Sequence, residues 1–183
     1  METEEKWTYY KNTESLQGTL EGEYADCVFE NCNFYQLQLG KVALSHCVFR
    51  NCNLSLSVFS GKACHDAVFI GCKMTGSDFS NSNSFSRYRF EECQLDYSVF
   101  RNVRMQKTLF VRCRLTEADF AEAQLKGSSF VYCDLEMAFF SNSDLTEVDF
   151  STAMNFTINP QSNKFSRSNL EGLVAHLGLQ LVP

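Results

Sequence analysis

Nine cysteines and three histidines are the side chains in this 183-residue sequence best suited to nucleophilic, redox or metal chemistry. Thiol, imidazole and carboxylate come together only at Cys64, His65 and Asp66. A catalytic Cys–His pair must face each other, whereas neighbours in an extended strand point to opposite sides. We therefore expect a core cysteine beside two surface residues, and enzymatic or redox use of Cys64 and His65 is the weakest of three functional hypotheses.

Known catalytic and metal-binding motifs are missing from the sequence. It has no CxxC pair, no zinc-type Cys/His spacing, no Gly-rich phosphate loop, no GxSxG and no HExxH. The sequence thus predicts a protein that is not an enzyme and needs no metal or cofactor.

The overall charge is acidic. Sixteen Lys and Arg stand against 22 Asp and Glu, for a net charge of -6 and a pI near 5.1, which argues against a nucleic-acid binder with a basic footprint. No apolar run approaches the roughly 20 residues of a membrane helix, and the acidic N-terminus is unlike a signal peptide. We expect a cytoplasmic protein that does not bind nucleic acid or membrane directly.

Large apolar residues recur every fifth position, and this period organises the chain. The two series run from Phe29 to Phe79 and from Phe85 to Phe150, with one extra residue within Ser80–Ser84, and all 25 positions are apolar. A period of five fits neither the 3.6 of a helix nor the 2 of a plain strand. The residue two before each of these central positions is Ala, Cys, Ser, Thr or Val in 21 cases; the exceptions are Leu37, Lys62, Asn83 and Tyr88.

Strings such as Ala118-Asp119-Phe120 and Cys133-Asp134-Leu135 show the unit: small, polar, large apolar, then two polar residues. This pattern resembles the pentapeptide-repeat family over roughly residues 24–155. The resemblance implies an all-β fold, a right-handed quadrilateral β-helix with one pentapeptide per side and four per coil. The central and small residues would point inward, and each coil would bury its apolar side chains by stacking on its neighbours.

With 20 residues per coil, most of the unusually numerous phenylalanines and cysteines fall at inward positions. Central phenylalanines would line two opposite walls, and eight cysteines fall on small inward positions, six of them in one column. Stacked rungs about 4.8 Å apart have parallel Cβ vectors, which do not suit a disulfide. We interpret these cysteines as small hydrophobic residues whose free thiols suit a reducing cytoplasm.

One face is irregular in two consecutive coils. Lys62 occupies a small inward position, and the extra residue lies beside it in the next coil. Because a lysine is not buried unpaired, this face should bulge outward. A tolerated β-bulge is the preferred interpretation; a recognition loop is the other, formed by Lys62, Ser82, Asn83 and Ser84.

The last segment leaves the repeat and predicts a short helix followed by an extended tail. Ser168 to Glu171 reads as a capping box and Gly178 as a helix stop. The segment could cap the solenoid or pair with a second copy, and the sequence favours neither alternative. We thus expect an N-terminal cap or irregular first coil (1–23), the β-helix (24–155) and a capping or dimerisation segment (156–183). Its candidate dimer-interface residues are Leu170, Leu173, Val174, Leu177, Leu179, Leu181 and Val182.

A helix followed by Leu-Gly-Leu-Gln-Leu-Val-Pro resembles the C-terminus of the Qnr, MfpA and McbG group of pentapeptide-repeat proteins. That resemblance implies a homodimeric rod that binds DNA gyrase or topoisomerase IV. Such proteins protect the enzyme from quinolones or peptide poisons by mimicking duplex DNA. Enterobacterial Qnr proteins also carry two projecting loops, whereas the repeat here has one inserted residue, which is closer to a compact MfpA- or McbG-like form.

Charge is concentrated near the predicted dimer end. Residues 116–155 carry -7, whereas residues 41–115 carry +6. In a dimer joined at its C-termini, the two acidic segments would carry twice that charge, -14, over about 19 Å of rod. Duplex DNA carries about -11 over that length. The candidate topoisomerase contacts are Glu117, Asp119, Glu122, Asp134, Glu136, Asp144, Glu147 and Asp149.

The leading hypothesis is therefore a DNA mimic that antagonises topoisomerase inhibitors, as an antibiotic-resistance or self-immunity protein. The alternative is a generic interaction scaffold with a non-topoisomerase partner bound at the irregular face, with carboxylates that only keep the rod in solution.

Overall fold

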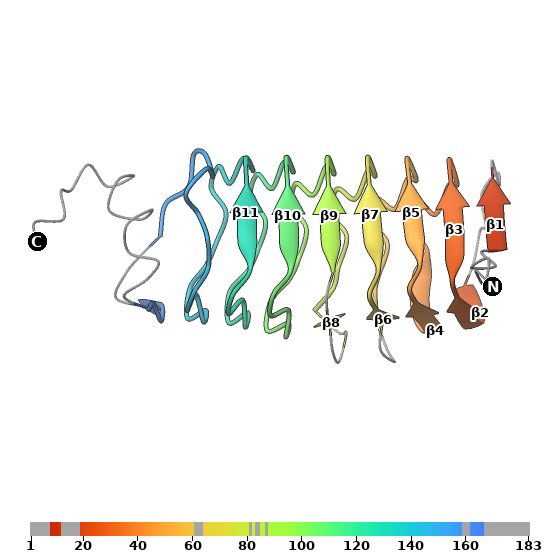
Figure 1. Cartoon of the computed structure of the whole chain (residues 1–183), viewed down its shortest axis with the longest axis horizontal. Coiled ribbons are helices and arrows are strands. Elements are labelled where there is room, and N and C mark those ends of the chain that lie inside the picture. Colours follow the sequence, from red (N-terminus) through yellow and green to blue (C-terminus); the bar gives the residue numbers. More distant parts are fainter. Residues whose placement is uncertain are drawn as a thin grey trace, which may run out of the picture.

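The chain folds as an all-β, right-handed, four-sided β-helix, and Figure 1 shows its strands stacked side by side along the rod. The computed structural model describes residues 8–11, 19–60, 64–80, 82, 85–86, 88–158 and 162–166. No helix within these ranges is long and apolar enough to cross a bilayer. The eleven strands are β1 (Thr8–Lys11), β2 (Thr19–Ala25), β3 (Cys27–Glu30), β4 (Gln38–Ser45), β5 (Val48–Arg50), β6 (Cys64–His65), β7 (Val68–Ile70), β8 (Phe85–Ser86), β9 (Arg89–Glu91), β10 (Leu109–Val111) and β11 (Ser129–Val131).

Four parallel ladders form the four faces of the rod. Face 1 is the sheet β1-β3-β5-β7-β9-β10-β11, and face 4 is the sheet β2-β4-β6-β8, continued by the bridges from Arg104 to Lys164. Face 2 is the row of single bridges from Asn33 to Met154, and face 3 is the row from Gln38 to Phe139. A regular coil has twenty residues, because Phe29 pairs with Phe49 and Phe49 with Phe69. The predicted fold is confirmed.

Most described corners between faces have a left-handed backbone at the residue two after the central position. Asn51, Leu56, Tyr97 and Met137 have φ angles of 50°, 57°, 59° and 55°. Asparagine tolerates this region, whereas the other three accept a conformation that is costly for residues with a Cβ. The turn repeats because the chain must change direction every five residues. Its consequence is that corner side chains, whatever their polarity, point away from the core.

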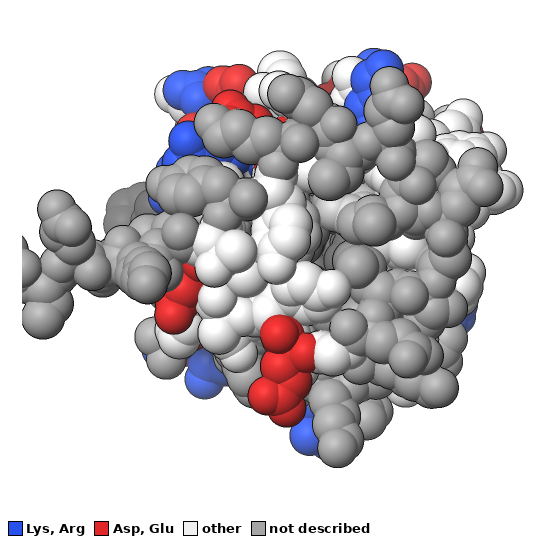
Figure 2. All heavy atoms as spheres, turned by 90° about the vertical axis from the view of Figure 1, so that its right-hand side faces the viewer, with Lys and Arg blue, Asp and Glu red and all other residues white. Residues whose placement is uncertain are grey.

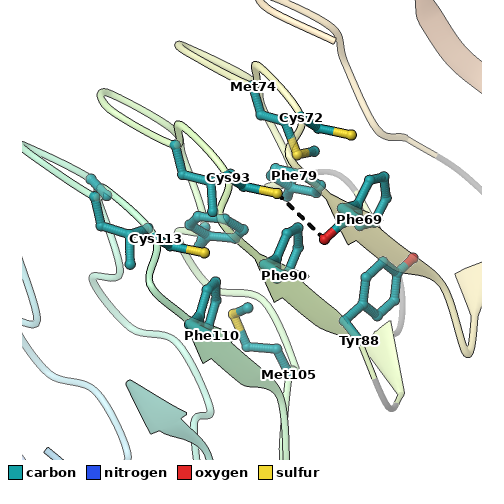
Figure 3. Close-up of a cluster of buried hydrophobic side chains, with 14 of the residues drawn as sticks. Phe69, Cys72, Met74, Phe79, Tyr88, Phe90, Cys93, Met105, Phe110 and Cys113 are labelled. Carbon is teal, nitrogen blue, oxygen red and sulfur yellow. Dashed lines mark hydrogen bonds between the residues drawn. The ribbon is translucent and has the colours of Figure 1, made fainter. Parts of the chain in front are cut away.

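Two ladders of stacked phenylalanines fill the core. On face 1, Phe90, Phe110 and Phe130 have ring centroids 4.9 and 4.8 Å apart and nearly parallel planes, as Figure 3 shows for Phe90 and Phe110. On face 3, Phe100 and Phe120 stack at 4.8 Å. The two ladders meet edge to face, with 6.0 Å between Phe100 and Phe110. Both arrangements are favourable for aromatic rings, so the spacing of the coils also sets the ring packing.

The small inward residues donate hydrogen bonds to the coil before them. The Cys93 thiol donates to the carbonyl oxygen of Phe69 at 3.4 Å (Figure 3). On face 3, the hydroxyls of Ser77 and Ser98 donate to the carbonyls of Leu54 and Met74, each at 2.8 Å. A small side chain is required there, and one with a donor links neighbouring coils. The eight described cysteines are all free and buried, as the repeat frame predicts.

The irregular stretch is accompanied by a large side chain at a small position. Tyr88 is buried beside the rings of Phe69 and Phe90, at centroid distances of 6.0 and 5.9 Å. The extra residue shifts the pairing from 20 to 21, so that Phe69 pairs with Phe90. The chain turns at Ser82, whose backbone N–H donates a hydrogen bond to the carbonyl oxygen of Phe79 at 3.1 Å. Lys62, Asn83 and Ser84 lie outside the described residues, so the recognition loop stays a prediction.

The coil stacking continues beyond residue 155. Phe156 stacks on Phe150 at 5.0 Å, and the N–H of Leu145 donates to the carbonyl of Lys164 at 2.9 Å. At the other end, Tyr10 of β1 stacks on Phe29 at 4.9 Å. The predicted C-terminal helix, its tail and the seven candidate dimer-interface residues lie outside the described residues.

We predict that Phe110→Ala lowers the free energy of unfolding by about 3–5 kcal/mol, because it leaves a cavity in the middle of both ladders. Urea denaturation measures the loss. Phe139→Ala is the matched control, since this phenylalanine is 54% exposed and its removal should change stability by about 0.5 kcal/mol or less. Equal losses in the two variants would contradict the packing described here.

We also predict that the eight described thiols do not react with a soluble disulfide reagent in the native protein. Burial raises the pKa of the Cys47 thiol to about 12 and raises that of Cys113 well above its usual value. Because a raised pKa keeps the thiol protonated, increasing the pH from 7 to 9 should not start the reaction of these two. Denaturant should expose all nine cysteines. Rapid native reaction of two or more thiols would show that the column is accessible.

Candidate protein-interaction surface

None of the eight acidic residues predicted to contact a partner is buried. The register places five of them on two adjacent faces, 2 and 3, or at the corners that end them: Glu117, Asp119, Glu122, Asp134 and Glu136. Asp144 and Glu147 belong to face 4, and Asp149 pairs with Ser129 on face 1. The acidic segment therefore carries more carboxylates on faces 2 and 3 than on faces 4 and 1. Figure 2, which views the rod end-on from β1, shows charged side chains toward the margins of the described surface.

Some of these carboxylates are already neutralised. Arg101 lies 2.8 Å from Asp119 and 3.8 Å from Glu122. Lys126 lies 3.7 Å from Glu147 on face 4. A partner would have to displace these cations or approach beside them.

Three of the other acids are held by hydrogen bonds. Asp134 accepts from the side-chain amide of Asn155 at 3.0 Å, and Asp149 accepts from the N–H of Ser151 at 2.9 Å. Partial burial of Asp144 opposes its ionisation, but hydrogen bonds from Thr146, with Lys164 and Lys126 nearby, keep its pKa below the ordinary value. Asp144 is therefore an anion at neutral pH.

Glu117 and Glu136 are the most available of the eight. Their backbones are neighbours in successive coils, joined by the N–H of Glu117 and the carbonyl of Glu136 at 2.8 Å. Within the described part of the chain, neither carboxylate forms an ion pair, and Glu136 is exposed. They supply negative charge directly to faces 2 and 3.

The positive charge of residues 41–115 is partly cancelled in place. Arg114 on face 2 binds Asp96. The Nε and Nη2 atoms of Arg114 lie 2.7 and 2.5 Å from the Oδ2 atom of Asp96. Asp96 is only 4% exposed, and its hydrogen bond raises the pKa of Arg114. Arg104 and Lys107, by contrast, are exposed on face 4 and form no ion pair with a described residue. Within the described residues, face 4 therefore carries two unpaired cations at this level of the rod, whereas the cations of faces 2 and 3, Arg114 and Arg101, are paired with carboxylates.

Large apolar side chains lie on the same acidic side. Met137 is 63% exposed and Phe139 is 54% exposed, and Tyr97 lies two coils earlier on the corner that Met137 continues. Sequence reasoning missed these residues because it counted charges alone. The signal was available: in the five-residue frame, Phe139 stands at an outward position, one before the central Phe140.

Two hollows adjoin Phe139. One, of about 380 Å³, lies toward face 3 and is lined by Tyr97, Arg101, Glu117 and Phe139 among others. The second, of about 540 Å³, is lined by Glu136, Met137, Phe139, Asn155 and Thr157 and neighbouring backbone. Faces 2 and 3 therefore carry surface hollows as well as negative charge.

Among the described residues, the cysteines, histidines and carboxylates that could do chemistry form no comparable site. His46 lies 3.8 Å from Asp26 and 3.4 Å from Asp66, on the corner between faces 4 and 1. Cys64 and His65 form β6, whose side chains are outside the described set. No group of three His, Cys, Asp or Glu among the described residues is arranged to hold a metal ion.

Comparison with solved structures identifies the same fold elsewhere. A trypsin-treated form of QnrB1, described as a plasmid-mediated fluoroquinolone resistance protein, is 18% identical, with a TM-score of 0.61 over 94% of this chain and 99% of that one. A second trypsin-treated form is 17% identical, with a TM-score of 0.56 over 96% and 98%. HetL from Nostoc, a pentapeptide repeat protein involved in heterocyst differentiation regulation, is 15% identical, with a TM-score of 0.30 over 86% of each chain. At these identities, the likeness to QnrB1 shows the fold.

No curated protein matches the chain by sequence. The family model described as a pentapeptide repeat region matches residues 23–100 and 83–173, which together make up most of the sequence. The same residues build the four-sided coils, the phenylalanine ladders and the column of buried thiols. The chain therefore belongs to the pentapeptide repeat family.

Proposed function

We propose that this protein binds a type II DNA topoisomerase, gyrase or topoisomerase IV, and protects it from quinolone or peptide inhibitors. It would act as a cytoplasmic homodimer without catalysing a reaction. The observation that carries the proposal is the concentration of five carboxylates on faces 2 and 3, and at the corners that end them, near the C-terminal end of the described rod. The fold shared with QnrB1 supports it.

The mechanism is competition for a DNA-binding surface. A topoisomerase cradles duplex DNA in a basic saddle, and a rigid rod with carboxylates at regular intervals offers that saddle similar charge. Successive coils are about 4.8 Å apart, and the acidic segment carries -7 per chain. Occupying the saddle would disfavour the poisoned cleavage complex, because that complex needs DNA in the same place.

The distribution of unpaired charge supports a contact through faces 2 and 3. Faces 2 and 3 carry Glu117 and Glu136, which no described cation neutralises, whereas exposed Arg104 and Lys107 make face 4 unsuitable for a basic saddle. An uneven charge distribution orients an approaching charged partner before contact. Within residues 116–155, faces 2 and 3 and the corners that end them carry five of the eight acidic residues.

The proposal predicts that purified protein restores gyrase supercoiling in the presence of a quinolone or a peptide poison. The double variant Glu117→Gln/Glu136→Gln should bind gyrase about tenfold more weakly and rescue correspondingly less. Arg101→Gln should bind more tightly, because it frees Asp119 and Glu122. Supercoiling gels and surface-immobilised gyrase measure the two effects.

The matched control is Glu147→Gln/Asp149→Asn, which removes the same charge from faces 4 and 1 and should rescue like the wild type. Absence of both rescue and gyrase binding by the wild-type protein would refute the proposed function. A pull-down that recovers another protein and no gyrase would favour the scaffold hypothesis and the face around residues 62–84.

Dimerisation is a separate prediction. The intact chain should have twice the monomer mass by light scattering, and a chain ending at Thr157 should be monomeric, because it lacks Leu170, Leu173, Val174, Leu177, Leu179, Leu181 and Val182. Circular dichroism checks that the shortened β-helix is folded. If the intact chain were monomeric, the predicted central acidic stretch, which needs two chains joined at their C-termini, would not exist.

A further inference from the structure

Phe139 is unlike every other residue of its row on face 3. The row runs Gln38, Val58, Asp78, Val99, Asp119 and Phe139, connected by successive bridges. Phe139 is a large aromatic residue with more than half of its side chain in solvent. Its backbone N–H donates to the carbonyl of Ala118 at 2.9 Å, so the backbone is fixed while the ring projects outward.

Phe139 forms a raised apolar point between two depressions. It lines both the hollow of about 380 Å³ on face 3 and the hollow of about 540 Å³ toward face 2. Met137, at the adjoining corner, lines the second hollow beside it. An exposed aromatic ring next to a flexible thioether is typical of the energetically dominant part of a protein interface.

Charge around this point defines the chemistry of the partner. Glu117 lines the hollow on one side of Phe139 and Glu136 the hollow on the other. Neither carboxylate is paired with a cation in the described part of the chain, and Arg101, the cation that lines the first hollow, is paired with Asp119 and Glu122. Two free anions around an exposed ring complement an apolar side chain flanked by Lys or Arg, and they disfavour a second copy of this acidic edge.

We propose that Tyr97, Glu117, Glu136, Met137 and Phe139, hereafter the edge patch, form a docking site for a basic protein segment that carries an apolar side chain. The ring of Phe139 supplies apolar contact, and a guanidinium or ammonium group of the partner can lie over its face in a cation–π contact. Glu117 and Glu136 pair with the flanking cations. This inference rests on the proposed function and deepens it, because it makes topoisomerase recognition partly apolar and not only an imitation of DNA charge.

The apolar and ionic parts of such a contact differ in their response to salt. Ions screen charge pairs over a Debye length of about 8 Å at physiological ionic strength, whereas apolar burial is not weakened in this way. Removing the ring should therefore lower affinity by a similar factor at every salt concentration. Removing the carboxylates should lower affinity mainly at low salt.

The experiment measures binding of the full-length protein to purified gyrase between 50 and 400 mM potassium chloride. We expect Phe139→Ser to weaken binding about tenfold throughout the series, with an unchanged dependence on salt. Tyr132→Ser is the matched control, because Tyr132 is 57% exposed at a corner of the same coil but on the edge between faces 1 and 2; it should bind like the wild type. Urea denaturation of each variant verifies equal stability.

Each outcome has a distinct meaning. Wild-type binding that Phe139→Ser leaves unchanged overturns the edge patch and leaves the proposed function standing. No wild-type binding at any salt concentration overturns both. A change in molar mass of Phe139→Ser by light scattering would show that the patch is covered by a second copy, and the inference would then be wrong.

Discussion

The stacking of one coil on the next at a fixed spacing is the constraint on which every other feature depends. Face-to-face phenylalanines at 4.8 to 5.2 Å along face 1 and edge-to-face contacts between the two ladders fit only if successive coils stay in register. Backbone bridges on all four faces and the thiol and hydroxyl bonds between coils hold the same register. Packing of helices or of ordinary sheets would not require a large apolar residue at every fifth position.

Because the interior takes only the central and small positions, the remaining positions are free to carry surface properties. They stand in rows along the rod, so one substitution alters one point of one row. Arg101 pairing with Asp119, and Arg114 with Asp96, both join residues 18 apart, close to one coil. The surface charge of this protein is therefore decided by which charged side chains meet across coils: Glu117 and Glu136 stay unpaired on faces 2 and 3, and Arg104 and Lys107 stay unpaired on face 4, within the described residues.

The repeat frame predicts the core almost completely, since Phe29, Phe110 and Cys93 follow directly from a period of five. It also places the eight acidic residues of the segment 116–155 at outward positions, and none of them is buried. It does not predict which carboxylates remain free, because the pairing of Arg101 with Asp119 depends on the registration of coils and on side-chain reach. Tyr88 at a small position is a second case: its accommodation beside Phe69 and Phe90 depends on a local change of register that periodicity alone cannot describe.

The most direct test of the central claim, that faces 2 and 3 meet the topoisomerase, is site-specific photocrosslinking from opposite sides of one coil. Ser141 follows Phe140 on face 3, and Ser151 follows Phe150 on face 1; both are exposed. A photoreactive residue at position 141 should crosslink to the basic DNA saddle of gyrase, and excess duplex DNA should suppress it, while the same residue at position 151 should give little product. Equal crosslinking from both positions, or crosslinking from 151 alone, would contradict a one-sided acidic contact.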